Sequence, residues 1–182
     1  AEDREPLVLS AHLDTVFPAG TDVTVHADGD LFRAPGVSDD GRGLAALVTV
    51  ARALSQADIT TQTPILFAAT VGEEGSGDLR GVRHLFRAGG VASEAAGFIS
   101  LDGAGLNYVV TRGLGARRFR VGLRGRGGHS WIDWGTPNPI HALGRAVGAL
   151  AAWPKPTDPA LSLTVARWGG GRSVNAIPAE AW

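Results

Sequence analysis

Seven side chains with the chemistry of a metal site or an acid–base catalyst follow the apolar segments of the first half of the sequence. They are His12, Asp14, Asp39, Asp40, Glu73, Glu74 and Asp102. One histidine with several carboxylates and no thiol is the ligand set of zinc, cobalt or manganese hydrolases. Carboxylates that converge without a cation would repel each other strongly. The set therefore predicts a pair of metal ions able to activate a water and to bind a carbonyl oxygen.

Each group also has an ordinary structural explanation. His12 and Asp14 are two residues apart on an extended segment, so their side chains share a face, and Asp14 could hold one ring nitrogen of His12 or merely cap it. One Asp of GVSDDGRG is enough to cap a following helix, which leaves the other Asp spare. The pair in GEEG could lie in a solvated loop, but here it closes an apolar strand, where unpaired carboxylates are costly. Asp102 alone could be a turn residue. The four motifs in this order are more specific than any one of them.

Alternating strands and helices are predicted to position these groups. Near-continuous apolar runs over 6–17, 63–75 and 95–105 are typical of strands buried on both faces of a parallel sheet. Helical spacing over 44–54 and 78–90 links them, the second helix being closed by glycine. This order predicts an α/β fold, a layered and mostly parallel sheet with flanking helices, in a domain over 1–111. Its carboxyl edge, where ligands bind, carries the candidate residues.

A smaller α+β domain is predicted over 112–182. The segment 116–125 alternates polar and apolar residues like a strand with one wet face. Asn138 and Pro139 begin a helix that extends to about residue 153. The segments LSLTVARW and SVNAIPAEAW follow as two more predicted strands.

The composition excludes several classes of protein. The net charge of −1 gives no pull towards nucleic acid or an anionic membrane, and no apolar run is long enough to span a bilayer. The absence of cysteine removes disulfides and thiol catalysis. No signal peptide is recognisable, so the cytoplasm is expected rather than secretion. Because the chain lacks methionine and both ends fall abruptly near predicted strands, we expect it to be a piece of a longer protein.

The motifs SAHLDTV, GVSDDGRG, TVGEEGSG and SLDGAG resemble those of the di-zinc exopeptidase and deacylase family. That family includes glutamate carboxypeptidase, acetylornithine deacetylase, succinyl-diaminopimelate desuccinylase, aminoacylase and tripeptidase. GRGGHSW and SVNAIPAE resemble motifs of its lid, or dimerisation, domain, so the likeness extends over nearly the whole chain. It implies an incomplete catalytic domain followed by an incomplete lid domain.

The resemblance implies a role for each member of the metal site. His12 and Asp102 would bind one Zn²⁺, Asp39 would bridge two, and Glu74 would bind the second. Glu73 would be the general base that takes a proton from the bridging water. Co²⁺ or Mn²⁺ would also be compatible with these ligands.

The remaining implied roles concern positioning and substrate. Asp14 would orient His12, and the Asp39–Asp40 peptide would be cis. His129 would reach the active site of the partner in a homodimer formed through the lid domain. Asn175 and Arg172 are candidates for contacts with a substrate carboxylate or carbonyl. The substrate would be a small peptide or an N-acyl amino acid, cleaved at its amide bond.

The family completes its second zinc site with a later histidine that has no counterpart in this chain. The remaining histidines are His26, His84, His129 and His141, and none lies in the required context. An alternative hypothesis is therefore a non-catalytic or truncated family member that dimerises or binds with an incomplete metal site. Nucleic-acid binding through RRFRVGLRGRGG is a third and weaker hypothesis, since Phe119 and Trp131 are its only candidates for stacking.

Overall fold

The structure, a computed structural model, describes residues 4–103, 105 and 107–182. These residues form two compact units that divide between residues 110 and 111, and each unit is described on its own. Within the described ranges, no helix is both long and apolar enough to cross a membrane.

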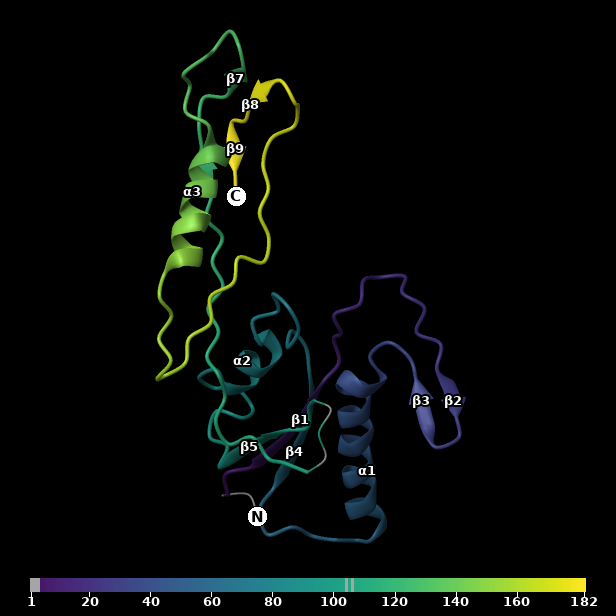
Figure 1. Cartoon of the computed structure of the whole chain (residues 1–182). Coiled ribbons are helices and arrows are strands. Elements are labelled where there is room, and N and C mark those ends of the chain that lie inside the picture. The colour runs from purple at the N-terminus through teal and green to yellow at the C-terminus, as the bar shows by residue number, and fades with distance from the viewer. Residues whose placement is uncertain (1–3, 104, 106) are drawn as a thin grey trace. The chain divides into compact units, whose positions relative to one another are not determined.

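A three-stranded parallel sheet forms the centre of the first unit (Figure 1). It consists of β1 (Leu7–His12), β4 (Ile65–Thr70) and β5 (Gly97–Ser100), in the order β4-β1-β5. Leu7 is paired with Ile65 on one side and with Gly97 on the other, so the three strands start level. The central position of β1 explains why Val8 and Ala11 are completely buried.

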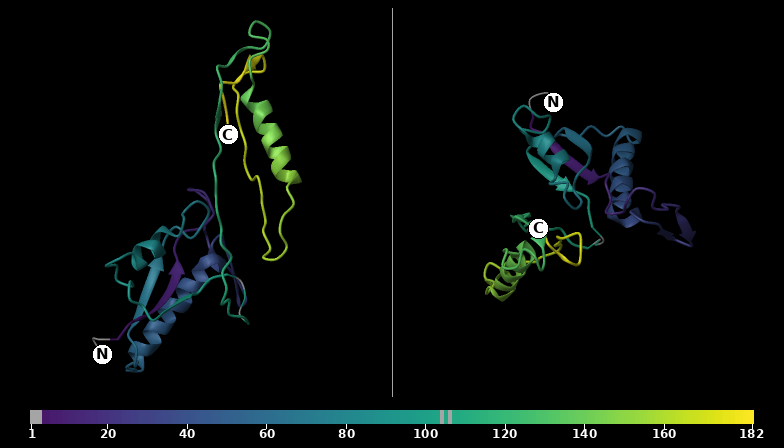
Figure 2. Two further views of the ribbon diagram at one scale, coloured as in Figure 1. Left: turned by 90° about the vertical axis from the view of Figure 1, so that its left-hand side faces the viewer. Right: turned by 90° about the horizontal axis from the view of Figure 1, so that it is seen from above.

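From β1 the chain first adds a strand on one side of β1 and then crosses over to add a strand on the other side. It passes through α1 (Arg42–Gln56) to β4, and then through α2 (Arg80–Phe86) to β5 on the far side of β1. Right-handed crossovers in opposite directions place their helices on opposite faces of a sheet. Figures 1 and 2 show α1 and α2 on opposite sides of the strands. This arrangement confirms the predicted α/β fold with a parallel sheet and flanking helices.

Each helix packs with a small apolar face. Leu47 of α1 is buried, and α1 contacts β1. Leu85 of α2 packs against a core cluster of Val8, Ala68 and Ala92. The predicted burial of every strand on both faces is wrong for β5, because Phe98 and Ile99 are 41% and 46% exposed at the edge of the described sheet.

Two short segments lie between β1 and α1. The antiparallel pair of β2 (His26–Asp28) and β3 (Leu31–Arg33) is exposed along its length. The segment η1 (Val37–Gly41) follows, with non-helical backbone angles at Asp39 and Asp40, and the peptide between these two residues is cis as the resemblance implied. The chain enters η1 through Gly36, whose φ of 76° is readily adopted only by glycine.

The second unit is built around α3 (Pro139–Ala152), which packs against a strand pair. Asn138 caps this helix by accepting hydrogen bonds from the Ile140 and His141 amides, as predicted. The pair consists of β6 (Leu123–Arg124) and β9 (Glu180–Ala181), and a second pair consists of β7 (Gly128–His129) and β8 (Ala176–Ile177).

One strand predicted for this unit is absent, and another is much shorter than predicted. Residues 161–168 form no strand, and only the last part of 116–125 becomes one, as β6. A strand needs a hydrogen-bonded neighbour, and neither segment has a continuous one among the described residues. The sequence alternation predicted which side chains would share a face of a strand. Without a continuous strand to bond to in the described part of the chain, these segments do not form a full strand. In place of a ladder, Arg120 stacks on the Trp182 ring at 4.5 Å.

Candidate metal centre

The candidate residues of the first unit converge at the carboxyl edge of the sheet. Two backbone hydrogen bonds continue the pairing beyond the strands: Leu13 donates to Thr70 at 2.8 Å, and Leu101 donates to Ser10 at 2.7 Å. The residues that follow β1, β4 and β5 therefore leave the sheet side by side. Because the chain reverses its winding direction at β1, this edge is a topological switch point, where open α/β sheets bind ligands.

His12 is the centre of the cluster. It ends β1 and is only 3% exposed. Its Nδ1 lies 2.8 Å from the Asp14 carbonyl oxygen, which can only accept, so Nδ1 carries the proton in this contact. Its Nε2 lies 2.8 Å from Asp39 Oδ1 and 3.8 Å from Asp102 Oδ1. The nitrogen that a cation would use therefore points at carboxylates from two other segments of the chain.

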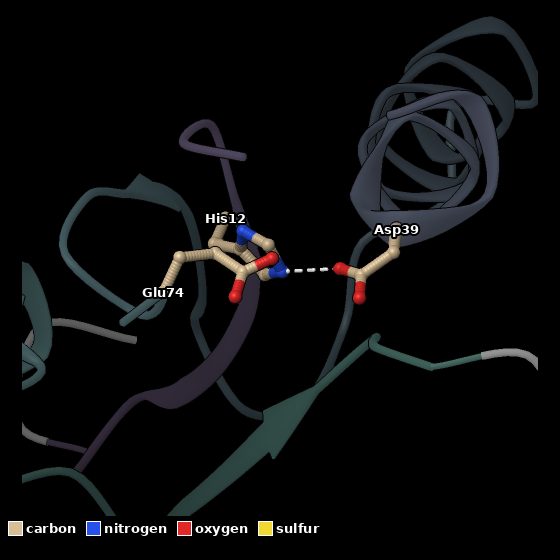
Figure 3. A group of neighbouring side chains, drawn as sticks. All are labelled: His12, Asp39 and Glu74. Carbon is tan, nitrogen blue, oxygen red and sulfur yellow. Dashed lines mark hydrogen bonds and ion pairs between the residues drawn. The ribbon is translucent and has the colours of Figure 1, made fainter. Parts of the chain in front are cut away.

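The carboxylates surround His12 in two overlapping groups of three. Ligand atoms of His12, Asp39 and Glu74 lie within 4.8 Å of one another, and so do those of His12, Glu73 and Asp102. Figure 3 shows the first group, in which Asp39 and Glu74 approach the imidazole of His12. The structure thus brings together all four predicted ligands and the predicted base. Each glutamate belongs to a different group, and the division of roles between them stays a prediction.

The electrostatics of this cluster favour a cation. Burial raises the pKa of Glu73, and the charge of Asp102 raises it further. Burial acts to lower the pKa of His12, but the Asp14 carbonyl, the Asp39 carboxylate and the charge of Asp102 outweigh it and raise this pKa. Negative charge from the neighbouring carboxylates adds to burial at Glu73 and to the Asp14 carbonyl contact at His12, and both groups hold protons more tightly. A divalent cation would relieve the same repulsion.

The carboxylate of Asp14 has a different partner from the one predicted. It lies 3.9 Å from Nδ1 of His12, and the backbone carbonyl of Asp14 makes the close contact instead. The carboxylate accepts backbone N–H groups from Gly72 at 2.8 Å, Glu73 at 3.3 Å and Glu74 at 3.0 Å. Burial acts to raise the pKa of Asp14, but these hydrogen bonds outweigh it and lower the pKa. Asp14 therefore holds the loop that carries both glutamates.

The substitution Asp14→Asn should loosen this loop while leaving the carbonyl contact to His12 in place. Asn offers one acceptor oxygen where Asp offers two, and its amide group would face backbone N–H donors. Loss of such a supporting contact typically costs about 10–100-fold in metal affinity or activity. Chelator competition and kcat measurements check this. Asp22→Asn is the control, because Asp22 is an exposed loop residue whose carboxylate accepts the nearby Thr24 amide. Equal behaviour of the two variants would contradict the role of Asp14.

The second unit contains the other predicted residues. The strand pair β7–β8 brings His129 beside Ala176, and the Asn175 carbonyl accepts the Ser130 amide at 3.0 Å. Nδ1 of His129 accepts from the amides of Trp131 and Ile132, so a neutral His129 carries its proton on Nε2. Arg172 is exposed. His129 and Asn175 are neighbours within this unit, and their roles towards a substrate stay predictions.

The donor set fits a divalent cation of the zinc type. One imidazole nitrogen and several carboxylate oxygens, with no thiolate, suit Zn²⁺, Co²⁺ or Mn²⁺. His12 is the only histidine in the clusters found among the described residues. His26 lies in β2, His84 in α2 and His141 in α3.

The family assignment rests on a match over most of the chain. The family model of peptidase family M20/M25/M40 matches residues 8–163, which include the metal cluster and most of the second unit. The chain belongs to this peptidase family. The expected resemblance to metal-dependent exopeptidases is therefore confirmed at the level of the family. A comparison with curated proteins found no match.

Solved structures of peptidases share the fold of this M20-family chain. A tripeptidase from Staphylococcus aureus subsp. aureus Mu50 is 20% identical, with a TM-score of 0.54 over 98% of this chain. Aminopeptidase PepT from Bacillus cereus ATCC 10987 is 22% identical, with a TM-score of 0.53 over 100% of this chain. The matches cover 47% and 48% of those proteins, so the chain spans about half the length of these solved relatives.

Proposed function

We propose that this chain forms the metal-binding part of a metal-dependent hydrolase that cleaves the amide bond of small peptides. The observation that carries the proposal is the convergence of His12 with Asp39, Glu73, Glu74 and Asp102 at the switch point of the sheet. Membership of a peptidase family gives this convergence a reaction class.

The protein side chains supply binding and proton transfer. His12, Asp39, Asp102 and Glu74 would hold the divalent cations. The cations, Zn²⁺ in the first instance, would make a water acidic near neutral pH and polarise the scissile carbonyl. Glu73 would accept a proton from the attacking water and would deliver it to the leaving amine. Its raised pKa suits a group that must both take and give a proton.

Peptides are the favoured substrates, with N-acyl amino acids as the second class. Two solved proteins with the same fold are described as a tripeptidase and as aminopeptidase PepT, which supports peptides. In a dimer formed through the second unit, His129 would polarise the substrate carbonyl of the partner subunit's site. We further propose that the last ligand of a second metal comes from a part of the protein beyond this half.

Metal content and a substrate screen test the function together. We expect the protein to bind Zn²⁺ and to hydrolyse di- or tripeptides, and we expect a chelator to abolish hydrolysis and Zn²⁺, Co²⁺ or Mn²⁺ to restore it. The N-acyl amino acids are screened beside the peptides to separate the two substrate classes. Metal binding without hydrolysis of either class would favour the non-catalytic alternative. Hydrolysis that survives chelation would contradict the proposal outright.

A further inference from the structure

Asp40 is a buried carboxylate beside the proposed metal centre and belongs to neither group of three candidate ligands found among the described residues. It is 2% exposed, whereas the side chain of its neighbour Asp39 is 57% exposed. Both of its oxygens are used within the protein. Oδ2 accepts the backbone N–H of His12 at 2.9 Å, and Oδ1 accepts the backbone N–H of Gly43 at 3.0 Å. The spare aspartate of the pair is thus Asp39, and Asp40 links the end of β1 to the first turn of α1.

The contact to His12 replaces a missing strand contact. Amides alternate in direction along a strand, and those of Leu7 and Leu13 point to the β4 side, where they bond to Pro64 and Thr70. The amide of His12 therefore points to the β5 side, but β5 ends at Ser100. The Asp40 carboxylate takes the place of the next strand carbonyl. The Asp40 carboxylate therefore holds the backbone of His12 at a position beyond the last strand pairing with β5.

The contact to Gly43 extends the same link towards Asp102. A Cβ at Gly43 would lie 2.1 Å from Asp40 Oδ1 and 2.4 Å from the Leu101 carbonyl oxygen, so only glycine allows this approach. Arg42, which precedes Gly43 and begins α1, donates a hydrogen bond to the Gly103 carbonyl. The first turn of α1 therefore touches the residues on both sides of Asp102, at 101 and 103.

The geometry points to Asp40 and Gly43 as a positioning clasp for the metal centre. The clasp holds the backbone of His12 and restrains Asp39, which is next to Asp40 in the chain. Through Gly43 it also sets how closely the segment that carries Asp102 approaches α1. Asp40 acts through these three ligands and touches neither cation nor substrate. This inference rests on the proposed function, because the ligands that it positions are those of the proposed centre.

The test compares Asp40→Asn with Leu47→Ala in the full chain. Asn has nearly the shape of Asp but can accept from only one of the two N–H groups. Leu47 is buried in the same helix and belongs to neither metal cluster, so its truncation lowers stability without touching the clasp. We expect Asp40→Asn to weaken Zn²⁺ binding by about 10–100-fold in chelator competition and Leu47→Ala to leave it unchanged, even at equal loss of Tm.

Two further measurements keep the test decisive. Hydrogen exchange at the His12 amide, followed without metal, should be slow in the wild type and in Leu47→Ala and faster in Asp40→Asn. Gly43→Ala disturbs the clasp from the helix side without changing charge and should also weaken Zn²⁺ binding. Equal Zn²⁺ affinity of Asp40→Asn and wild type, or rapid exchange at His12 in the wild type, would overturn the inference. If the wild type binds no Zn²⁺, the proposed function fails, whereas His12 exchange still reports on the clasp.

Discussion

Substituting Glu73 by Gln should abolish most hydrolysis while the protein keeps its metal. The amide is close in size to the carboxylate but cannot accept a proton from water. General acid–base groups typically contribute about 10²–10⁴-fold to a rate, so we expect kcat to fall by that factor with little change in KM. Burial and the charge of Asp102 both raise the pKa of Glu73, so its carboxylate form is disfavoured in the folded protein, and the metal-free Glu73→Gln variant should unfold at the same or a higher temperature.

The matched control for this variant is Glu74→Gln, at the adjacent position. If Glu74 is a ligand and Glu73 the base, the Glu74 variant should lose Zn²⁺ affinity and the Glu73 variant should not. The reverse result would exchange the two assignments, which the structure allows because each glutamate lies in a group of three with His12. Full activity of Glu73→Gln would leave the proposed mechanism without a base.

Substituting Asp39 by Asn should empty the centre. Asp39 Oδ1 lies 2.8 Å from Nε2 of His12, and its side chain is 57% exposed, so it faces the space that a cation would enter. Asn removes a negative charge and one ligand oxygen. Changes to supporting contacts alone cost about 10–100-fold, and loss of a direct ligand should cost at least about 100-fold in Zn²⁺ affinity.

Metal analysis and chelator competition measure this effect, with hydrolysis as the second readout. Asp28→Asn is a suitable control, because Asp28 is an exposed aspartate of β2 whose pairing with Arg33 lies outside the cluster. We expect this control to bind Zn²⁺ like the wild type. An Asp39→Asn protein with wild-type metal content and activity would refute the bridging role of Asp39.

The positions of the candidate residues were predictable because they depend on rules of parallel sheets. The apolar segments before His12, Glu73 and Asp102 predicted three strands, and helical spacing between them predicted crossovers. Strands linked in this way end at one edge, so their next residues meet. The position of β1 between its two partners was not predicted, and it makes this edge a switch point.

The partners of the two supporting aspartates could not be predicted from spacing. Asp14 reaches backbone amides 58 to 60 residues away, and Asp40 reaches the His12 amide 28 residues away. Which N–H groups are left without a strand partner depends on where β5 ends and how the 72–74 loop turns. Gly72 has a φ of 82°, which favours glycine, so the glycine in the sequence indicates a turn here. It does not indicate which group accepts the amides of the residues in that turn.

The level start of the three strands has a consequence for folding. His12 lies opposite Thr70, two residues before Gly72, because Leu7 lies opposite Ile65. A slip of one residue along β1 would turn its side chains to the other face and move His12 away from the carboxylates. A divalent cation would bind only the correctly registered sheet, and a ligand of one state stabilises that state. We therefore expect metal binding to favour the correct register of β1 over shifted registers during assembly of the sheet.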